Sequence, residues 1–141
     1  MEEEMVTTKK AEISPAEWQV MRIVWTLKEV TAQDIIDVML RKTSWTESTI
    51  KTLIGRLVKK GYLAKNDESR PYLYTALVTE ELTMEEHEKQ LIASFCAHHV
   101  GSVLTDVLSD TELTKSDIQR MIVMLTEKAK TAPEVVQCNC I

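Results

Sequence analysis

Hydroxyl-bearing and basic side chains share one face of a predicted helix at residues 46–60. The i, i+3, i+4, i+7 spacing of an amphipathic helix is met by the apolar residues Ile50, Leu53, Ile54, Leu57 and Val58. The opposite face presents Ser48, Thr49, Lys51, Thr52, Gly55, Arg56 and Lys59. Short side chains let a helix enter the DNA major groove, where threonine and basic groups contact base edges and phosphates. The pattern therefore predicts a DNA recognition helix, and the alternative is an ordinary solvated face.

Gly55 lies in the middle of this predicted helix. Glycine there costs about 1 kcal/mol relative to alanine. Two explanations are open, a close approach of DNA or relief of packing against the first helix.

The second chemical feature is the pair Cys138 and Cys140. Residues two apart in an extended segment point the same way, so both thiolates can bind one ion. Thiolates select soft ions such as Cu(I) or Zn(II). Because structural Zn(II) takes four ligands and Cu(I) accepts two or three sulfurs, one pair suits Cu(I), and two pairs from two subunits suit Zn(II). A reactive tail or a chance spacing is the alternative.

Charge is distributed unevenly along the chain, which has a net charge of −5. Residues 13–78 contain 10 basic residues (lysine and arginine) and 7 acidic residues (aspartate and glutamate). The rest of the chain contains 7 basic and 15 acidic residues. Screening removes the influence of charges beyond ~8–10 Å, so the local basic excess governs contact with phosphate.

Helix-start signals predict two further helices before the predicted recognition helix. Ser14, Pro15 and Glu17 form a capping box with proline at the first helical position, and Thr31 begins a second helix. The third helix begins near Thr46 and ends at Gly61.

A hairpin is predicted after the third helix. Residues 62–65 are short and apolar, residues 72–78 are aromatic and β-prone, and a turn cluster lies between them at 66–71. Lys65 and Arg70 flank the tip of this hairpin, and we expect both to contact DNA. Three helices and a two-stranded wing form a winged helix-turn-helix domain, which we place at residues 10–78. The fold class is mainly α with a small β-wing, followed by a helical dimerisation domain.

Residues 79–130 are predicted to form acidic helices. A capping box at residues 83–86 begins a helix that continues to about Leu108, and another begins near Thr114. Two helices cannot fully bury such apolar stripes, so we expect a homodimer. Cys96 is expected to be a packed core thiol. The adjacent histidines are expected at the helix surface or dimer seam, with metal ligation as the alternative. Residues 131–141 are expected to be a flexible tail that carries the cysteine pair.

Residues 13–78 resemble the penicillinase-repressor (BlaI/MecI) family of winged-helix repressors. The resemblance rests on Ile13–Met21, Thr31–Ile36, Thr49–Gly61 and Tyr72–Tyr74, together with Trp25 and Trp45. It implies a homodimer on a pseudo-palindromic operator. It also implies groove contacts by Thr49, Thr52 and Arg56, assisted by Ser48 and Lys51.

Two segments resemble CopY, the copper-responsive branch of this family, namely Phe95–Gly101 and Val135–Ile141. The resemblance implies a repressor that holds a TACA/TGTA operator with Zn(II) bound and releases it when Cu(I) replaces zinc. A copper chaperone would then be a source of Cu(I). That branch usually carries two cysteine pairs, and this sequence contains one.

Other functions fit the sequence less well than a copper-responsive repressor does. A β-lactam-responsive repressor of the same family is released by cleavage of an Asn-Phe bond, and Phe95 follows Ser94 here. A metal-buffering protein would leave the recognition face unused. No GxSxG, P-loop, GxGxxG or HExxH motif occurs, so we expect no enzyme. The acidic start is unlike a signal peptide and no apolar run is long enough for a membrane span, so we expect a cytoplasmic protein without membrane contact.

Overall fold

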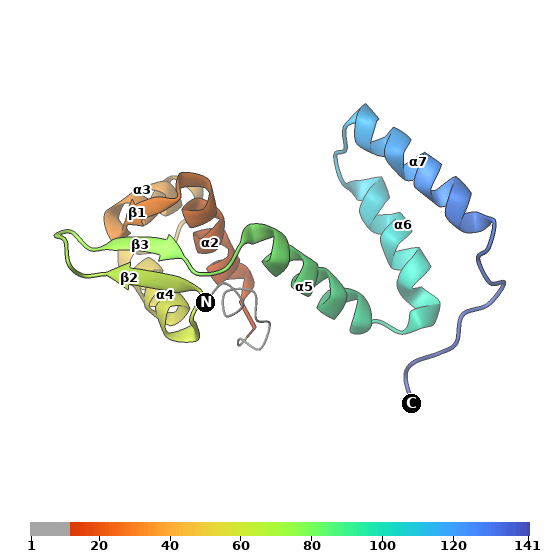
Figure 1. Cartoon of the computed structure of the whole chain (residues 1–141), viewed down its shortest axis with the longest axis horizontal. Coiled ribbons are helices and arrows are strands. Elements are labelled where there is room, and N and C mark those ends of the chain that lie inside the picture. The colour runs from red at the N-terminus through yellow and green to blue at the C-terminus, as the bar shows by residue number, and fades with distance from the viewer. Residues whose placement is uncertain (1–11) are drawn as a thin grey trace. The chain divides into compact units, whose positions relative to one another are not determined.

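The computed structural model describes residues 12–141. Residues 1–11, which include the expected start of the DNA-binding domain at residue 10, lie outside the described residues. The chain divides into two compact units; the first ends at Glu86 and the second extends from His87 to Ile141. The elements of the first unit are shown in Figure 1 and are α2 (Pro15–Leu27), β1 (Glu29–Thr31), α3 (Ala32–Lys42), α4 (Glu47–Lys60), β2 (Leu63–Asn66) and β3 (Leu73–Ala76).

The three predicted helices of the first unit are present, with the expected caps. The Ser14 side chain accepts from Glu17 N while the Glu17 carboxylate accepts from Ser14 N, which completes the capping box of α2. A second box between Thr31 and Asp34 begins α3. Thr46 caps α4, which ends at Gly61 with φ 89°, a left-handed conformation that suits glycine.

The sheet has three strands in the order β1-β3-β2, all antiparallel. The β2–β3 hairpin is the predicted wing. The sequence did not predict β1, which pairs with the other edge of β3 and places Val30 opposite Tyr74. This pairing joins the start of α3 to the wing.

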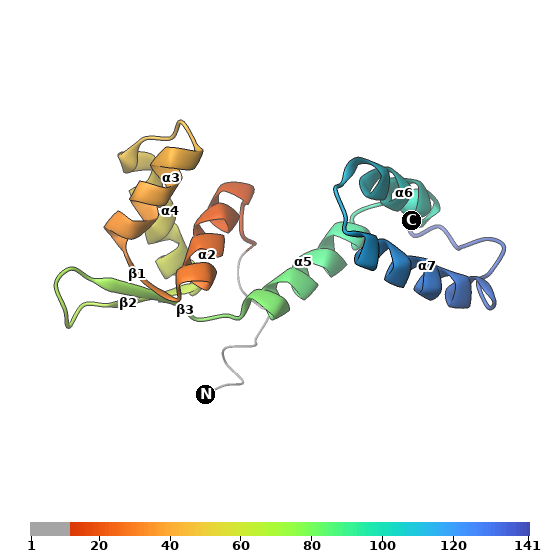
Figure 2. The same cartoon turned by 90° about the horizontal axis from the view of Figure 1, so that it is seen from above.

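The core of the first unit lies between the helices and the sheet. Figure 2 shows α2, α3 and α4 on the same side of the strands, with the hairpin tip projecting past them. Buried residues come from every one of these elements, and the largest fully buried side chains include Met21, Ile35, Met39, Ile50 and Leu57. Trp25 packs edge-on against Trp18 at 5.9 Å between ring centroids, and its Nε1 donates to the Val78 carbonyl at 3.0 Å.

The helices that follow differ from the expected ones in two places. α5 (Glu80–Ala93) begins before Thr83, because Thr79 provides the cap by accepting from Leu82 N at 3.2 Å. The helix expected to continue to Leu108 is interrupted at residues 94–96. There the Ser94 hydroxyl donates to the Leu91 carbonyl at 2.6 Å, and Cys96 takes an extended conformation with ψ 132°.

Beyond this break are the short 3-10 helix η1 (Ala97–His99), then α6 (Val100–Asp110) and α7 (Lys115–Ala129). Thr114 caps α7 as expected. No residue of α5, α6 or α7 is buried. The exposed apolar side chains on these helices include Leu91, Leu104, Val107, Ile118, Ile122 and Leu125.

Among residues 12–141, no single helix is long and apolar enough to cross a membrane. Glu80–Ala93 and Ala97–Asp110 reach that length and composition only as a pair, and the pair is bent by 103°.

Candidate nucleic-acid interface and thiol cluster

The residues predicted to contact DNA all have exposed side chains. Six lie along the solvent face of α4 and two lie on the wing, namely Ser48, Thr49, Lys51, Thr52, Arg56, Lys59, Lys65 and Arg70. The apolar face of α4 is buried through Ile50, Leu53, Ile54 and Leu57. The structure therefore brings six of the predicted residues together on one helix face.

Local contacts hold part of this helix face in place. The Thr46 hydroxyl donates to Thr49 Oγ1 at 3.1 Å, and the Thr52 hydroxyl donates to the Ser48 carbonyl at 3.1 Å. Lys51 forms an exposed i, i+4 ion pair with Glu47 at 3.1 Å. An exposed pair of this kind contributes only a few tenths of a kcal/mol. Lys51 can therefore leave Glu47 and bind a phosphate group at little cost in free energy.

Arg56 and Lys59 have no hydrogen bond or ion pair within residues 12–141. Their cationic groups are therefore available to a ligand.

The space beside Gly55 distinguishes the two explanations for this glycine. A Cβ built at Gly55 would meet no atom within 4 Å. Relief of packing against α2 is therefore excluded. Gly55 lies on the exposed face between Thr52 and Arg56, so its missing side chain lowers the surface where the predicted groove contacts are.

An ion pair positions the C-terminal end of α4. Lys60 Nζ lies 2.7 Å from Glu17 Oε1 and donates to the Glu12 carbonyl at 2.9 Å. Glu17 is 1% exposed, and it also accepts from Ser14 N at 2.9 Å. Burial raises the pKa of Glu17, but the hydrogen bonds from Lys60 and Ser14 outweigh burial and hold this pKa below its usual value. The start of α2 is thereby fixed to the end of α4.

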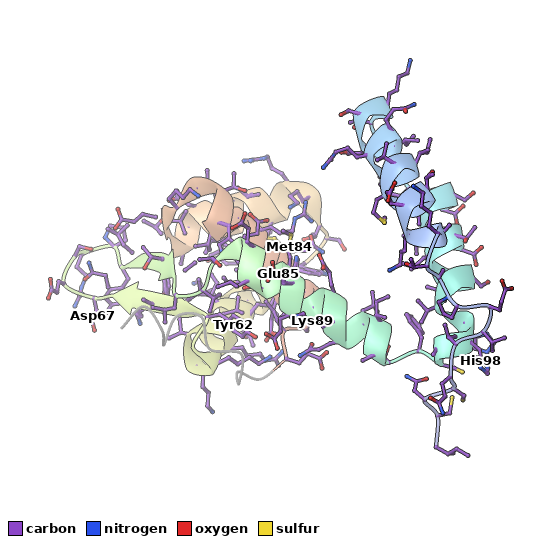
Figure 3. All side chains as sticks on the ribbon, turned by 45° about the vertical axis from the view of Figure 1, so that its right-hand side comes forward. Tyr62, Asp67, Met84, Glu85, Lys89 and His98 are labelled. Atoms are coloured by element: carbon purple, nitrogen blue, oxygen red, sulfur yellow. The ribbon has the colours of Figure 1, made fainter. Side chains whose placement is uncertain are left out.

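The two basic residues of the wing share one aromatic ring. Lys65 Nζ lies 4.2 Å and Arg70 Cζ lies 4.7 Å from the centroid of the Tyr72 ring. Arg70 also donates to the Asp67 carbonyl at 3.2 Å, and Figure 3 shows Asp67 at the tip of the hairpin. Cation–π contacts of this kind hold the two charges near the wing tip.

Three thiols meet in the second unit. The sulfurs of Cys96, Cys138 and Cys140 all lie within 4.8 Å of one another, and the Sγ atoms of Cys96 and Cys138 are 3.9 Å apart. Cys138 and Cys140 are exposed and Cys96 is half-buried. The interpretation of Cys96 as a packed core thiol was wrong, because the helix expected to bury it is interrupted at residues 94–96.

The thiols of the tail differ in acidity. The backbone N–H of Cys140 donates to Cys138 Sγ at 3.4 Å, and this contact lowers the pKa of Cys138. Hydrogen bonding with Cys96 and Cys138 raises the pKa of Cys140 to about 11. Of the two tail thiols, Cys138 thus ionises more readily, and a soft cation would have to displace the proton of Cys140.

The donor set fits a soft metal ion. All three candidate ligand atoms are sulfur, the chemistry preferred by Cu(I) and by zinc–thiolate sites. His98 Nε2 lies 3.0 Å from the Val136 carbonyl, and this contact orients the ring toward the tail backbone. His99 is exposed, and its side chain forms no hydrogen bond with the tail among residues 12–141. Sequence reasoning missed Cys96 as a neighbour of the pair, because the apolar spacing continues across the helix break that brings Cys96 to the tail.

Comparisons with known proteins place the chain in a family. The model of the penicillinase repressor family matches residues 13–127. An uncharacterised 16.5 kDa protein of Latilactobacillus sakei is 46% identical over 92% of this chain and 89% of its own length. The methicillin resistance regulatory protein MecI of Staphylococcus aureus is 31% identical over 85% of this chain and 98% of its own length.

Among solved structures, the monomeric form of Bacillus licheniformis BlaI in complex with the blaP half-operator is 32% identical. The match covers 54% of this chain and 93% of that chain, with a TM-score of 0.49. The family match and the MecI identity each span most of this chain. The chain therefore belongs to the penicillinase-repressor family and is a DNA-binding transcriptional repressor, not an enzyme.

Proposed function

We propose that this protein is a copper-responsive transcriptional repressor that binds a pseudo-palindromic operator as a homodimer in the cytoplasm. The observation that carries the proposal is the coexistence of an exposed recognition face on α4 with a cluster of thiols at the end of the same chain. The first supports operator binding, and the second supports a response to a soft metal ion.

The operator contacts follow from the chemistry of the α4 face. Thr49 and Thr52 offer methyl and hydroxyl groups to base edges, and Arg56 offers a fork of donors to guanine. Ser48, Lys51 and Lys59 contact phosphates, and so do Lys65 and Arg70 from the wing. In a dimer the two recognition helices would lie about 34 Å apart to reach successive major grooves.

The homodimer is supported by the unburied helices. α5, α6 and α7 expose apolar side chains and bury none, which a single chain leaves in contact with water. A second copy would cover these side chains and would supply the second recognition helix.

Cys138 and Cys140 would hold Cu(I) through their thiolates, and Zn(II) would occupy the operator-bound form. The ion, when bound, supplies a soft centre that ties thiolates of the tail together. We propose that this arrangement disfavours the helix spacing needed on the operator. Since linkage is reciprocal, operator binding weakens Cu(I) binding by the same factor. A copper chaperone is the proposed source of Cu(I).

Fluorescence anisotropy with a TACA/TGTA duplex and a scrambled duplex tests the proposal. The titration is run with apo protein, with Zn(II) and, under reducing anaerobic conditions, with Cu(I). Specific binding that is lost on addition of Cu(I) is the expected result, and a Cys138→Ser/Cys140→Ser protein should keep binding in Cu(I). Specific binding with an affinity that neither metal changes would contradict copper sensing and would favour a repressor released by proteolysis.

A further inference from the structure

The tail of the second unit is docked on the break between α5 and η1. Asn139 Oδ1 accepts from Ala97 N at 2.8 Å, and Asn139 Nδ2 donates to the Phe95 carbonyl at 3.4 Å. The amide of Asn139 therefore bridges the two backbone groups on either side of Cys96. His98 adds a contact with the Val136 carbonyl at 3.0 Å, and Figure 3 shows His98 beside the C-terminal segment.

This docking places three sulfurs at the corners of a triangle. Asn139 lies between Cys138 and Cys140 in sequence, so fixing its amide beside Cys96 brings both tail thiols to that residue. At a metal–sulfur bond of about 2.3 Å, three sulfurs around one ion lie about 4 Å apart. The Cys96–Cys138 distance of 3.9 Å matches that value, and no pair of the three exceeds 4.8 Å.

We propose that Cys96, Cys138 and Cys140 of a single chain form a three-thiolate Cu(I) site, with Asn139 as the residue that positions the tail. The inference rests on the proposed function for the identity of the ion. It adds a third ligand from outside the tail and makes the site complete within one protomer. Cys96 thus ties the metal to the junction of α5 and η1 rather than to the tail alone.

The geometry favours Cu(I) over Zn(II). Structural Zn(II) takes four ligands, and the described part of the chain offers three that converge. The Nε2 atom of His98 is directed at the Val136 carbonyl. A site of this kind holds one ion per chain, whereas a site shared by the tails of two subunits would hold one ion per dimer.

Competition with a chromophoric Cu(I) chelator tests the site on the full chain, without DNA and under anaerobic reducing conditions. The wild-type protein should bind one Cu(I) per chain. Cys96→Ser should lower the Cu(I) affinity at least about ten-fold, with a changed ultraviolet thiolate-to-copper absorption band. His99→Ala, a change in the same segment at an exposed side chain without a hydrogen bond to the tail, should leave affinity and spectrum unchanged.

Asn139→Ala keeps all three thiols and removes the two hydrogen bonds that dock the tail. Its Cu(I) affinity should fall about 10–100-fold at unchanged stoichiometry, and hydrogen exchange at the Ala97 N–H should accelerate in the apo protein. Gln137→Ala, which removes a neighbouring amide without a docking contact, is the matched control and should resemble the wild type.

Two results would overturn the inference. One is a Cys96→Ser protein that binds Cu(I) with wild-type affinity and spectrum, and the other is a stoichiometry of one ion per two chains. These results are separate from failure of the proposed function. If the three-thiolate site binds Cu(I) as described but the operator is not released, copper sensing fails and the site stands.

Discussion

At the scale of single residues, the exposed face of α4 combines small and charged side chains in a way that packing does not require. Gly55 has open space around its Cα, and Arg56 has no partner among residues 12–141. A helix selected only for stability would carry alanine at position 55 and a paired charge at position 56. Both departures are explained by a ligand that approaches this face closely.

Gly55→Ala should separate stability from operator binding. Alanine fits the open space and should stabilise the protein by about 1 kcal/mol, while its methyl group should weaken operator binding in the groove. Gly101→Ala on α6, where a Cβ also meets nothing within 4 Å, is the matched control and should affect stability alone. Urea unfolding and anisotropy measure the two effects. Unchanged operator affinity in Gly55→Ala would contradict a close approach at this position.

Arg56→Ala should cost about 1–3 kcal/mol of operator affinity and relax specificity at one base pair, if the guanidinium reads a guanine. Binding to a scrambled duplex should change little. Arg22→Ala, an exposed arginine on α2, serves as the control. A uniform loss on both duplexes with a smaller salt slope would instead assign Arg56 to phosphate.

At the scale of elements, the domain is organised around the connection between α2 and α4. The capping box of α2 places Glu17 where it receives both Ser14 N and Lys60 Nζ. One carboxylate thus completes the cap at the start of α2 and holds the C-terminal end of α4. The orientation of the exposed polar face of α4 therefore depends on a contact remote from that face.

Glu17→Gln should destabilise the protein by roughly 1–3 kcal/mol at pH 7, because it leaves Lys60 without its carboxylate. The pKa of Glu17 is lowered in the folded state. Its contribution is therefore present above the unfolded pKa and is lost as the pH falls through the folded pKa. The difference in unfolding free energy between wild type and variant should shrink in acid.

Urea denaturation at neutral and acidic pH measures this difference. Glu47→Gln removes the exposed partner of Lys51 and should change stability by no more than about 0.5 kcal/mol at either pH. A Glu17→Gln difference that is independent of pH would show that the carboxylate charge is not what stabilises the native state.

Helix caps and the wing could be predicted from the sequence because the interactions that form them are local. Ser14, Thr31, Thr46 and Gly61 each act within a few residues, and all four have the expected role. β1 was not predicted, since Glu29–Thr31 is a strand only through pairing with β3 far along the chain. The break at residues 94–96 was missed because the apolar spacing continues across it.

The same limits apply to the candidate site. The exposed polar face of α4 follows from helical period alone, whereas the convergence of a third thiol on the tail pair could not be predicted. Cys96 lies on an apolar stripe in sequence, and only the break and the docking by Asn139 bring it to the tail. Contacts between segments 42 residues apart leave no periodic signal.

At the scale of the whole molecule, the two units differ in how they bury apolar surface. The first contains a core that includes Met21, Ile36 and Leu57, and the helices α6 and α7 of the second bury no residue. A domain of this size without a core is not stable alone. Its folding should therefore depend on association.

Ile122→Glu should shift the protein from dimer to monomer, because a carboxylate would be buried without a partner in a seam that includes Ile118 and Leu125. Sedimentation velocity measures the shift, and affinity for a full operator should fall toward that for a half-operator. Ser116→Glu, an exposed change on the opposite face of α7, should remain dimeric. A dimeric Ile122→Glu protein would place the interface elsewhere.

Every tryptophan and tyrosine of the chain lies in the first unit, while the second has Phe95 as its single aromatic residue. Intrinsic fluorescence therefore arises from the winged domain alone, with Trp25 tethered at Val78. Absorption by copper–thiolate bonds would arise from the other unit alone. One unlabelled sample thus carries two optical signals from its two halves, and a single stopped-flow experiment could time metal capture against the response of the DNA-binding domain.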